Sequence, residues 1–265
     1  MKKGMNEYGI PKGISREEEF RMLAEAGFDG LELNIDGALS DAELAELKAL
    51  SEKYGVKVTG FVATQLWKYH LTSNDEANRE EAKNLVKMLI THAEYFGCDS
   101  VLVVPGVVNE NVSYLQAWEN AKRALTELKP FICEHKVTVC VENVWNKFLT
   151  SAMDMAKFVD ELDCEYIQSY FDAGNVLISA YPEYWIEILG KRIKKVHIKD
   201  FRRSVGNIEG FVGLMEGDMD WKKLMAALRA VGYDDFVTVE VPCYSCAPEL
   251  FLKHTSAQLD TIFSL

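Results

Sequence analysis

The stretch Val137-Thr-Val-Cys-Val-Glu142 decides the fold, because it reads as a buried β-strand that ends in a carboxylate. Strands of a parallel sheet are covered on both faces and are therefore almost wholly apolar. A charged side chain at the far end of such a strand is costly unless another group pairs with it. Four runs share this design, and the other three are Tyr166-Ile-Gln-Ser-Tyr-Phe-Asp172, Val196-His197-Ile198 and Phe236-Val-Thr-Val-Glu240-Val241. These runs predict one site that is built from four strand ends.

A repeated unit of helix, glycine and strand surrounds these runs. A glycine after a helix supplies the left-handed residue that ends it. In each unit the glycine is followed by one apolar residue, one or two polar residues and a strand. The glycines are Gly27, Gly55, Gly97 and Gly232. Helix starts are predicted by the capping-box pairs Ser15 with Glu18, Ser40 with Glu43 and Ser73 with Glu76, and by Asp220 before a helix over 221–231.

The strand and helix patterns alternate along the whole chain. Strands are expected at about 2–6, 30–34, 57–62, 100–104, 137–142, 167–172, 194–198 and 236–241. Strands that alternate with helices pair in parallel, and eight such units close into a (β/α)8 TIM barrel. A doubly wound open sheet is the alternative, but no G-x-G-x-x-G motif follows the first strand. We therefore expect residues 1–265 to form a single TIM-barrel domain.

Composition narrows the class of protein. The chain has 265 residues, of which 48% are hydrophobic, and it carries a net charge of −12. An acidic surface repels polyanions, which argues against a nucleic-acid partner. No apolar run approaches the ~20 residues that span a bilayer, so no membrane association is expected. The N-terminus lacks a signal-peptide pattern, which predicts a cytoplasmic protein with reduced cysteines. Cys243 and Cys246 form a C-x-x-C without the second pair of a zinc ribbon, so they are interpreted as incidental thiols.

Glu142, Asp172, His197 and Glu240 end the fifth to eighth predicted strands. The C-terminal ends of the strands carry the active site in TIM barrels, so these side chains are neighbours around half of the barrel mouth. Each residue alone is better explained by solvation, by an ion pair or as a satisfied core histidine, but the joint pattern favours a metal site. Oxygen ligands with one imidazole suit Mn²⁺, Mg²⁺, Co²⁺, Fe²⁺ or Zn²⁺.

Five stretches resemble the xylose-isomerase-like barrels, a family that includes sugar-phosphate isomerases, ketose 3-epimerases, inosose dehydratases and abasic-site endonucleases. They are Val141-Glu-Asn143, Tyr170-Phe-Asp-Ala-Gly-Asn175, His197-Ile-Lys-Asp200, Glu216-Gly-Asp-Met-Asp-Trp221 and Thr238-Val-Glu-Val241. The segments 142–148 and 191–200 look most similar to the L-xylulose/L-ribulose 5-phosphate 3-epimerase branch. The resemblance implies one divalent ion, usually Mn²⁺, held by residues matching Glu142, Asp172, His197 and Glu240.

Such a site can move a proton next to a ketose carbonyl. A divalent ion stabilises the negative charge of the enediolate, and two acid/base groups exchange protons on opposite faces. Glu142 and Glu240 are the expected acid/base pair, each with one oxygen on the ion and the other on the proton. The matching glutamates have these roles in related epimerases, while Asp172 and His197 are expected only to ligate.

Substrate contacts are predicted from residues that follow the strands. Lys147, Arg202 and Arg203 could bind a phosphate, although ordinary surface charges are slightly favoured for each. Lys199 is explained equally well by a contact with a sugar hydroxyl or by a salt bridge below the rim. Trp67 could cover the apolar face of a sugar, although packing against its loop is the commoner arrangement. Asn175, Gln65 and Glu32 are further candidates. Family members that use free sugars tend to carry a Glu soon after the fifth-strand ligand and a His shortly after the sixth-strand Asp. Here these neighbourhoods read Lys147-Phe-Leu149 and Gly174-Asn175, which favours a phosphorylated sugar.

The favoured function is a metal-dependent 3-epimerase of a ketopentose 5-phosphate. The same site would also serve an aldose–ketose isomerase or an inosose-type dehydratase. An abasic-site endonuclease would need more metal ligands and a basic groove, and the five histidines and acidic charge argue against it. A non-catalytic sugar-binding barrel is disfavoured by the intact ligand set. The resemblance also implies a homodimer or homotetramer.

Overall fold

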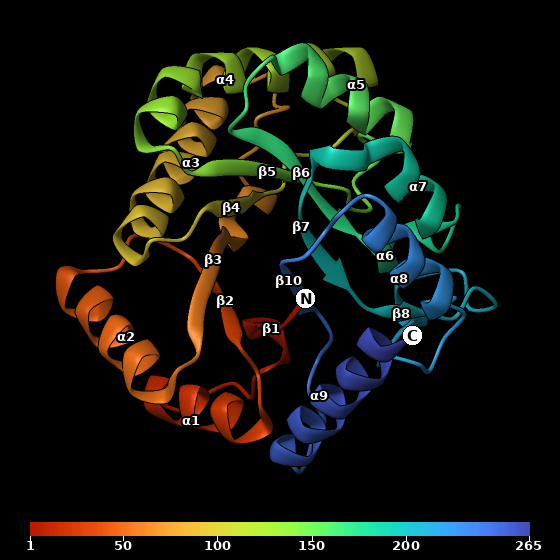
Figure 1. The fold of residues 1–265 in the computed structure, drawn as a ribbon. Helices are drawn as coiled ribbons and strands as arrows, with labels where there is room; N and C mark the ends of the chain where they lie inside the picture. Colours follow the sequence, from red (N-terminus) through yellow and green to blue (C-terminus); the bar gives the residue numbers. More distant parts are fainter.

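The computed structural model describes all 265 residues and forms a closed barrel of eight parallel strands inside a ring of helices (Figure 1). The strand order is β1-β10-β7-β6-β5-β4-β3-β2, and the barrel closes where Lys2 to Met5 of β1 pair with Phe236 to Val239 of β10. The barrel strands are β1 (Lys2–Asn6), β2 (Gly30–Ile35), β3 (Lys57–Ala63), β4 (Ser100–Val103), β5 (Thr138–Glu142), β6 (Ile167–Asp172), β7 (Ile193–Ile198) and β10 (Phe236–Val239). The predicted TIM barrel is confirmed.

Most of the helices lie between successive strands and form the outer ring. They are α1 (Arg16–Ala26), α2 (Asp41–Tyr54), α3 (Glu76–Phe96), α4 (Tyr114–His135), α5 (Ala152–Leu162), α6 (Ala173–Val176), α7 (Pro182–Leu189), α8 (Trp221–Ala230) and α9 (Pro248–Ser264). Short 3-10 helices η1 (Glu7–Gly9), η2 (Thr64–Trp67), η3 (Gly190–Arg192) and η4 (Ile208–Gly210) complete the loops. No helix combines the length and the apolar character that crossing a membrane requires.

The helix caps agree with the sequence at most positions. Ser40 and Glu43 form a reciprocal capping box, and Gly97 ends α3 in the left-handed conformation with φ of 69°. Ser15 caps α1 as predicted, but the Glu18 side chain pairs with Arg21 and does not complete the capping box. The capping box expected at Ser73 is wrong. Asp75 caps α3 by accepting a hydrogen bond from the Ala77 amide, while the Ser73 hydroxyl accepts from the Asp75 amide in the preceding turn. Serine and aspartate are equally good caps, so tertiary packing chooses between them.

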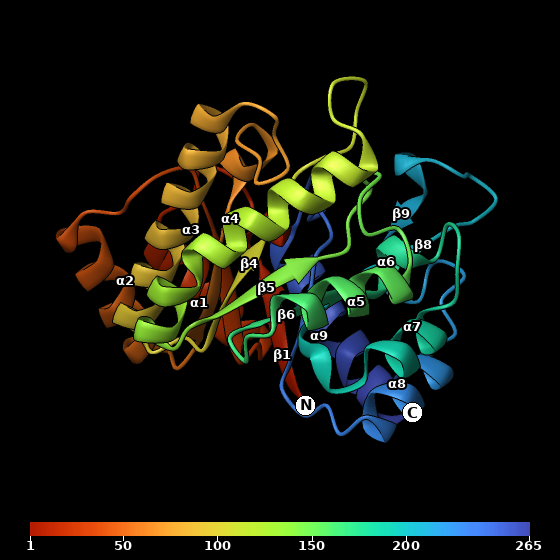
Figure 2. The ribbon, with the colours of Figure 1, turned by 90° about the horizontal axis from the view of Figure 1, so that it is seen from above.

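A small antiparallel sheet after β7 is absent from the sequence prediction. It pairs β8 (Asp200–Phe201) with β9 (Phe211–Val212) and lies to the right of the barrel strands in Figure 2. Strands of two residues are too short to show alternation, which explains the omission. β10 also ends one residue before Glu240, although the Glu240 amide still donates to the Ile198 carbonyl at 3.1 Å.

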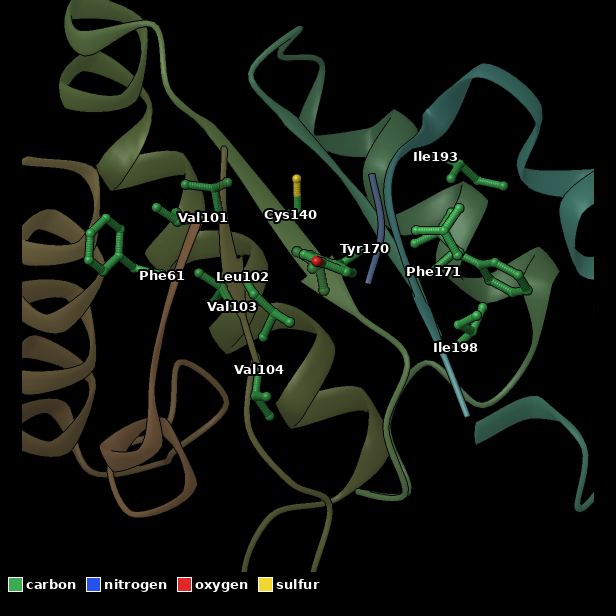
Figure 3. Close-up of a cluster of buried hydrophobic side chains, with 14 of the residues drawn as sticks. Phe61, Val101, Leu102, Val103, Val104, Cys140, Tyr170, Phe171, Ile193 and Ile198 are labelled. Atoms are coloured by element: carbon green, nitrogen blue, oxygen red, sulfur yellow. The ribbon is translucent and has the colours of Figure 1, made fainter. Parts of the chain in front are cut away.

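One apolar cluster fills the space within the barrel and between the barrel and its helices. Figure 3 shows part of it, with Val101 to Val104 following one another along the chain and with Phe171 near Ile193 and Ile198. All residues of β4 and β5 are buried, as expected for strands of a parallel sheet. The packed core therefore fixes the positions of the strand ends, and with them the backbone that carries the polar side chains.

Candidate metal centre

Glu142, Asp172, His197 and Glu240 converge at the C-terminal ends of β5, β6, β7 and β10. These four strands are consecutive neighbours in the barrel, and Asp172 lies directly opposite His197 in the register of β6 and β7. One potential ligand atom from each side chain lies within 4.8 Å of all the others. The structure thus brings together all four residues that the sequence singled out.

His197 lies at the centre of this group and is completely buried. Its Nδ1 atom is 3.1 Å from Glu142 Oε1 and 4.0 Å from Glu240 Oε2. Its Nε2 atom is 2.7 Å from Glu32 Oε2. Burial by itself lowers the pKa of His197, but the Glu32 charge and the hydrogen bonds with both glutamates outweigh it and raise that pKa well above its usual value.

Lys199 follows His197 by two residues and points into the same group. Its ammonium donates to Asp172 Oδ2 and Glu240 Oε2, and its side chain is 8% exposed. Burial disfavours the charged amine, but the carboxylates of Asp172 and Glu240 raise the pKa of Lys199 above its usual value. Lys199 therefore belongs to the site itself and is a permanent positive charge beside two of the carboxylates.

The three carboxylates differ in their surroundings. Burial raises the pKa of Glu142 to about 7, with His197 opposing the shift. Burial also raises the pKa of Asp172, although the Lys199 charge opposes it. For Glu240 the burial effect is outweighed by the positive charges of Lys199 and His197, so its pKa is lowered.

The donor set fits a divalent cation. Four donor atoms that all lie within 4.8 Å of one another can reach one ion, because ligand distances of about 2.2 Å put any two ligands at most roughly 4.4 Å apart. Three carboxylates and one imidazole suit hard or borderline divalent ions rather than a thiolate-held structural zinc. Asp172 and His197 project from the rigid inner strands, so the group is largely preformed.

Glu32 is a buried partner of the site that the sequence indicated only as a possible substrate contact. It lies within β2, is 2% exposed, and its carboxylate accepts from Asn6 and Tyr170 as well as contacting His197. The sequence does contain a sign of this role, because Glu32 is an ionisable residue that lies between two apolar residues, Leu31 and Leu33, within a strand. Its partner was not predictable, because His197 is 165 residues away in sequence.

The other predicted substrate contacts lie around the rim of the barrel. Asn175 is close to the centre, because its amide donates to Asp172 Oδ1 at 2.9 Å, but its side chain already donates to the Asn143 carbonyl. Lys147 is exposed in a left-handed conformation with φ of 62°. Arg203 is exposed, and its guanidinium lies over the Tyr181 ring at 4.8 Å.

Gln65 and Trp67 lie in η2, after β3, on the other half of the barrel mouth. The Gln65 side chain donates to the Asp36 carbonyl, and Trp67 is 51% exposed. The four candidate ligands and Lys199 thus form one compact group. The remaining candidates are separate rim positions that a bound substrate would have to span.

Comparison with known proteins adds a family and a set of relatives. A family model described as xylose isomerase-like TIM barrel matches residues 20–261. L-ribulose-5-phosphate 3-epimerase UlaE of Salmonella paratyphi A is 25% identical over 248 residues, covering 87% of this chain and 83% of that protein. Among solved structures, the IOLI protein with a binding zinc atom has a TM-score of 0.87 at 19% identity, covering 100% of this chain and 98% of that one. D-psicose 3-epimerase from Clostridium cellulolyticum H10 has a TM-score of 0.82 at 18% identity, covering 99% and 98%. Both structures share the fold of this chain.

Proposed function

The chain belongs to the xylose isomerase-like TIM barrel family and is an enzyme of the sugar isomerase/epimerase type, and we propose that it epimerises C3 of a ketopentose 5-phosphate with a divalent metal ion. One observation carries this proposal. Two glutamates, Glu142 and Glu240, flank the candidate ligands Asp172 and His197 within a group whose donor atoms lie within 4.8 Å of one another.

The positions of the two glutamates suit proton transfer on two faces of a substrate. β5 and β10 are separated by β6 and β7 in the barrel, so Glu142 and Glu240 approach the centre from different sides. A base and an acid on opposite faces allow a proton to be removed from one face and returned to the other. Glu240 is 31% exposed and Glu142 only 5%, so the mouth opens on the Glu240 side.

Each group has a distinct role in the proposal. Glu142, Asp172, His197 and Glu240 would hold the ion, with Mn²⁺ as the predicted metal. A bound ion would supply stabilisation of the negative charge that develops on the sugar oxygens. Glu142 and Glu240 hold and move the proton at C3. Lys199 keeps Asp172 and Glu240 in place and offers a cation to a sugar oxygen.

The phosphorylated substrate is supported by the relatives and by the rim. The curated relatives at 25% identity act on L-ribulose 5-phosphate by name. Lys147 and Arg203 are exposed cations on loops that follow β5 and β7. A guanidinium and an ammonium are the side chains that most often bind a phosphate group. A cytoplasmic location and assembly into a dimer or tetramer stay predictions.

The direct test is proton exchange in D₂O. The purified protein with Mn²⁺ is incubated with ketopentoses and ketohexoses, each free and phosphorylated, and deuterium is located by NMR at each carbon. We expect deuterium at C3 together with the C3 epimer, most rapidly for a ketopentose 5-phosphate. A chelator and the Glu142→Gln variant are the controls: the chelator should abolish exchange, and the variant should slow it by about 10²- to 10⁴-fold.

Other exchange patterns would contradict the proposal in defined ways. Deuterium at C1 or C2 would make the enzyme an aldose–ketose isomerase. Loss of water from an inosose, without exchange into any ketose, would make it a dehydratase. Faster turnover of the free sugar than of its phosphate would overturn the substrate class while leaving the 3-epimerase chemistry in place.

A further inference from the structure

Glu32 is an ionisable side chain in the interior of the barrel, below the rim where a substrate would bind. It lies in the middle of β2, opposite Asn6 of β1, and is 2% exposed. A carboxylate buried to this extent is strongly unfavourable unless several donors surround it. The contacts of Glu32 therefore indicate why the position carries a charge.

Three donors from three strands converge on this carboxylate. Oε2 lies 2.7 Å from His197 Nε2 and accepts from Asn6 Nδ2 at 2.7 Å, while Oε1 accepts from the Tyr170 hydroxyl at 2.8 Å. Tyr170 lies among the buried side chains of the barrel, as Figure 3 shows. Its ring is also packed against the imidazole of His197, with centroids 4.4 Å apart.

These contacts determine which nitrogen of His197 faces the other candidate ligands. An ionised carboxylate only accepts hydrogen bonds, so the imidazole nitrogen beside Glu32 carries a proton. The Nδ1 atom also lies beside a carboxylate, 3.1 Å from Glu142 Oε1, but a cation held by the candidate ligands would take the place of a proton on that nitrogen. That nitrogen is Nε2, and Nδ1 is left facing Glu142 and Glu240. Histidine ligands commonly donate their second ring N–H to a carboxylate, which fixes the tautomer and raises the basicity of the ligating nitrogen.

We propose that Glu32 is a positioning residue that holds His197 in the Nε2–H tautomer and presents Nδ1 to a divalent cation. Asn6 and Tyr170 in turn orient the Glu32 carboxylate. The inference rests on the proposed function insofar as His197 is a metal ligand. It excludes a direct contact between Glu32 and the sugar, because the imidazole and Tyr170 cover the carboxylate.

The test compares Mn²⁺ binding by the wild type, Glu32→Gln and Glu19→Gln, measured from the EPR signal of free Mn²⁺. Gln keeps the shape and one acceptor oxygen but removes the charge. Glu19 is a matched control, since it is a carboxylate on α1 with 3% exposure that contacts none of the candidate ligands. We expect Glu32→Gln to weaken Mn²⁺ binding about 10- to 100-fold and Glu19→Gln to leave it unchanged. Tyr170→Phe, which removes one donor to Glu32, should have a smaller effect in the same direction.

Two further measurements separate positioning from a purely structural role. In the Zn²⁺-loaded wild type, long-range ¹H–¹⁵N spectra should show His197 protonated at Nε2 and not at Nδ1. Raising the Mn²⁺ concentration should restore much of the turnover of Glu32→Gln without changing KM for the sugar. Circular dichroism establishes that each variant is folded.

The outcomes distinguish this inference from the proposed function. If the wild type binds Mn²⁺ and exchanges at C3 but Glu32→Gln binds equally tightly, the positioning role alone is overturned. Turnover that stays low in Glu32→Gln at saturating Mn²⁺, with wild-type affinity, would place Glu32 in contact with the substrate instead. Absence of Mn²⁺ binding by the wild type would overturn both proposals.

Discussion

The two halves of the barrel mouth satisfy their polar side chains in different ways. On the amide half, formed by the ends of β1 and β2, Asn34 Nδ2 donates to Asn6 Oδ1 at 2.9 Å. These two side chains are neutral and pair with each other, and Asn6 also donates to the single buried carboxylate of this half, Glu32. On the ligand half, formed by the ends of β5, β6, β7 and β10, three carboxylates surround one imidazole and one ammonium. Neutral amides can satisfy one another, whereas clustered carboxylates repel unless cations offset their charge. The difference makes the ligand half the better place to hold a cation.

The largest expected effect is on turnover when the glutamates of the ligand half are neutralised. Glu142→Gln and Glu240→Gln should each lower kcat by about 10²- to 10⁴-fold, because each removes an acid/base group. The measurement is C3 proton exchange at saturating Mn²⁺, with Glu46→Gln, an exposed change on α2, as control. Full activity in Glu240→Gln would eliminate the two-base mechanism.

The next effect is on metal affinity. Asp172→Asn should weaken Mn²⁺ binding by about 100-fold or more, since losing a direct ligand costs at least as much as losing an outer partner. The Asn175 amide can still donate to the remaining side-chain oxygen, so the local backbone is expected to stay in place. Titration calorimetry with Mn²⁺ measures the effect. Unchanged affinity would remove Asp172 from the ligand set.

A pair of glycine substitutions compares the crowding of the two halves. At Gly174, after β6, an added Cβ would lie 2.7 Å from the Lys199 carbonyl oxygen, whereas at Gly37, after β2, it would meet nothing within 4 Å. Gly174→Ala should lower the free energy of unfolding by about 3 kcal/mol, as overpacking does, and should weaken Mn²⁺ binding. Gly37→Ala should change neither quantity. Urea unfolding measures both variants, and equal stabilities would show that the ligand half is not tightly packed.

The smallest effect is a pH dependence away from the site. Burial, with the nearby charge of Glu7, raises the pKa of Glu19 to about 7, although Arg16 opposes the shift. The folded state therefore binds the proton more tightly than the unfolded state does, so stability falls as the pH rises from about 5 to about 8. Relative to Glu19→Gln, the wild type should lose about 2 kcal/mol over this range. Urea unfolding measures the free energy of unfolding of both proteins at each pH. A difference between the two proteins that stays constant across this range would contradict the prediction.

The sequence predicted the barrel and the candidate ligands for the same reason. Buried strands are apolar, so Glu142, Asp172 and His197 are conspicuous at their ends, and the C-terminal ends of parallel strands meet at one face. The sequence did not predict β8 and β9, whose two residues each carry no periodic signal. It also placed a capping box at Ser73, because a serine and an aspartate two positions apart compete for the same cap.

The roles of Lys199 and Glu32 illustrate the limit of reading residues one at a time. The spacing of His197 and Lys199 places both on one face of a strand, but whether the ammonium joins the carboxylates or leaves the barrel depends on the neighbouring strands. Glu32 was assigned to a possible substrate contact because it lies in a strand. Its actual partner comes from the opposite wall of the barrel, from β7.

The sequence by itself determined the alternation of strands and helices, the parallel barrel and the four residues that could share an ion. These properties follow from local periodicity and from the cost of burying a charge, and both can be recognised within a short stretch of sequence. The tertiary structure alone decided that Nδ1 of His197 faces the other candidate ligands and that Lys199 bridges Asp172 and Glu240. Such contacts join residues from different walls of a closed barrel, and their geometry depends on strand register and stagger, which no single stretch of sequence contains.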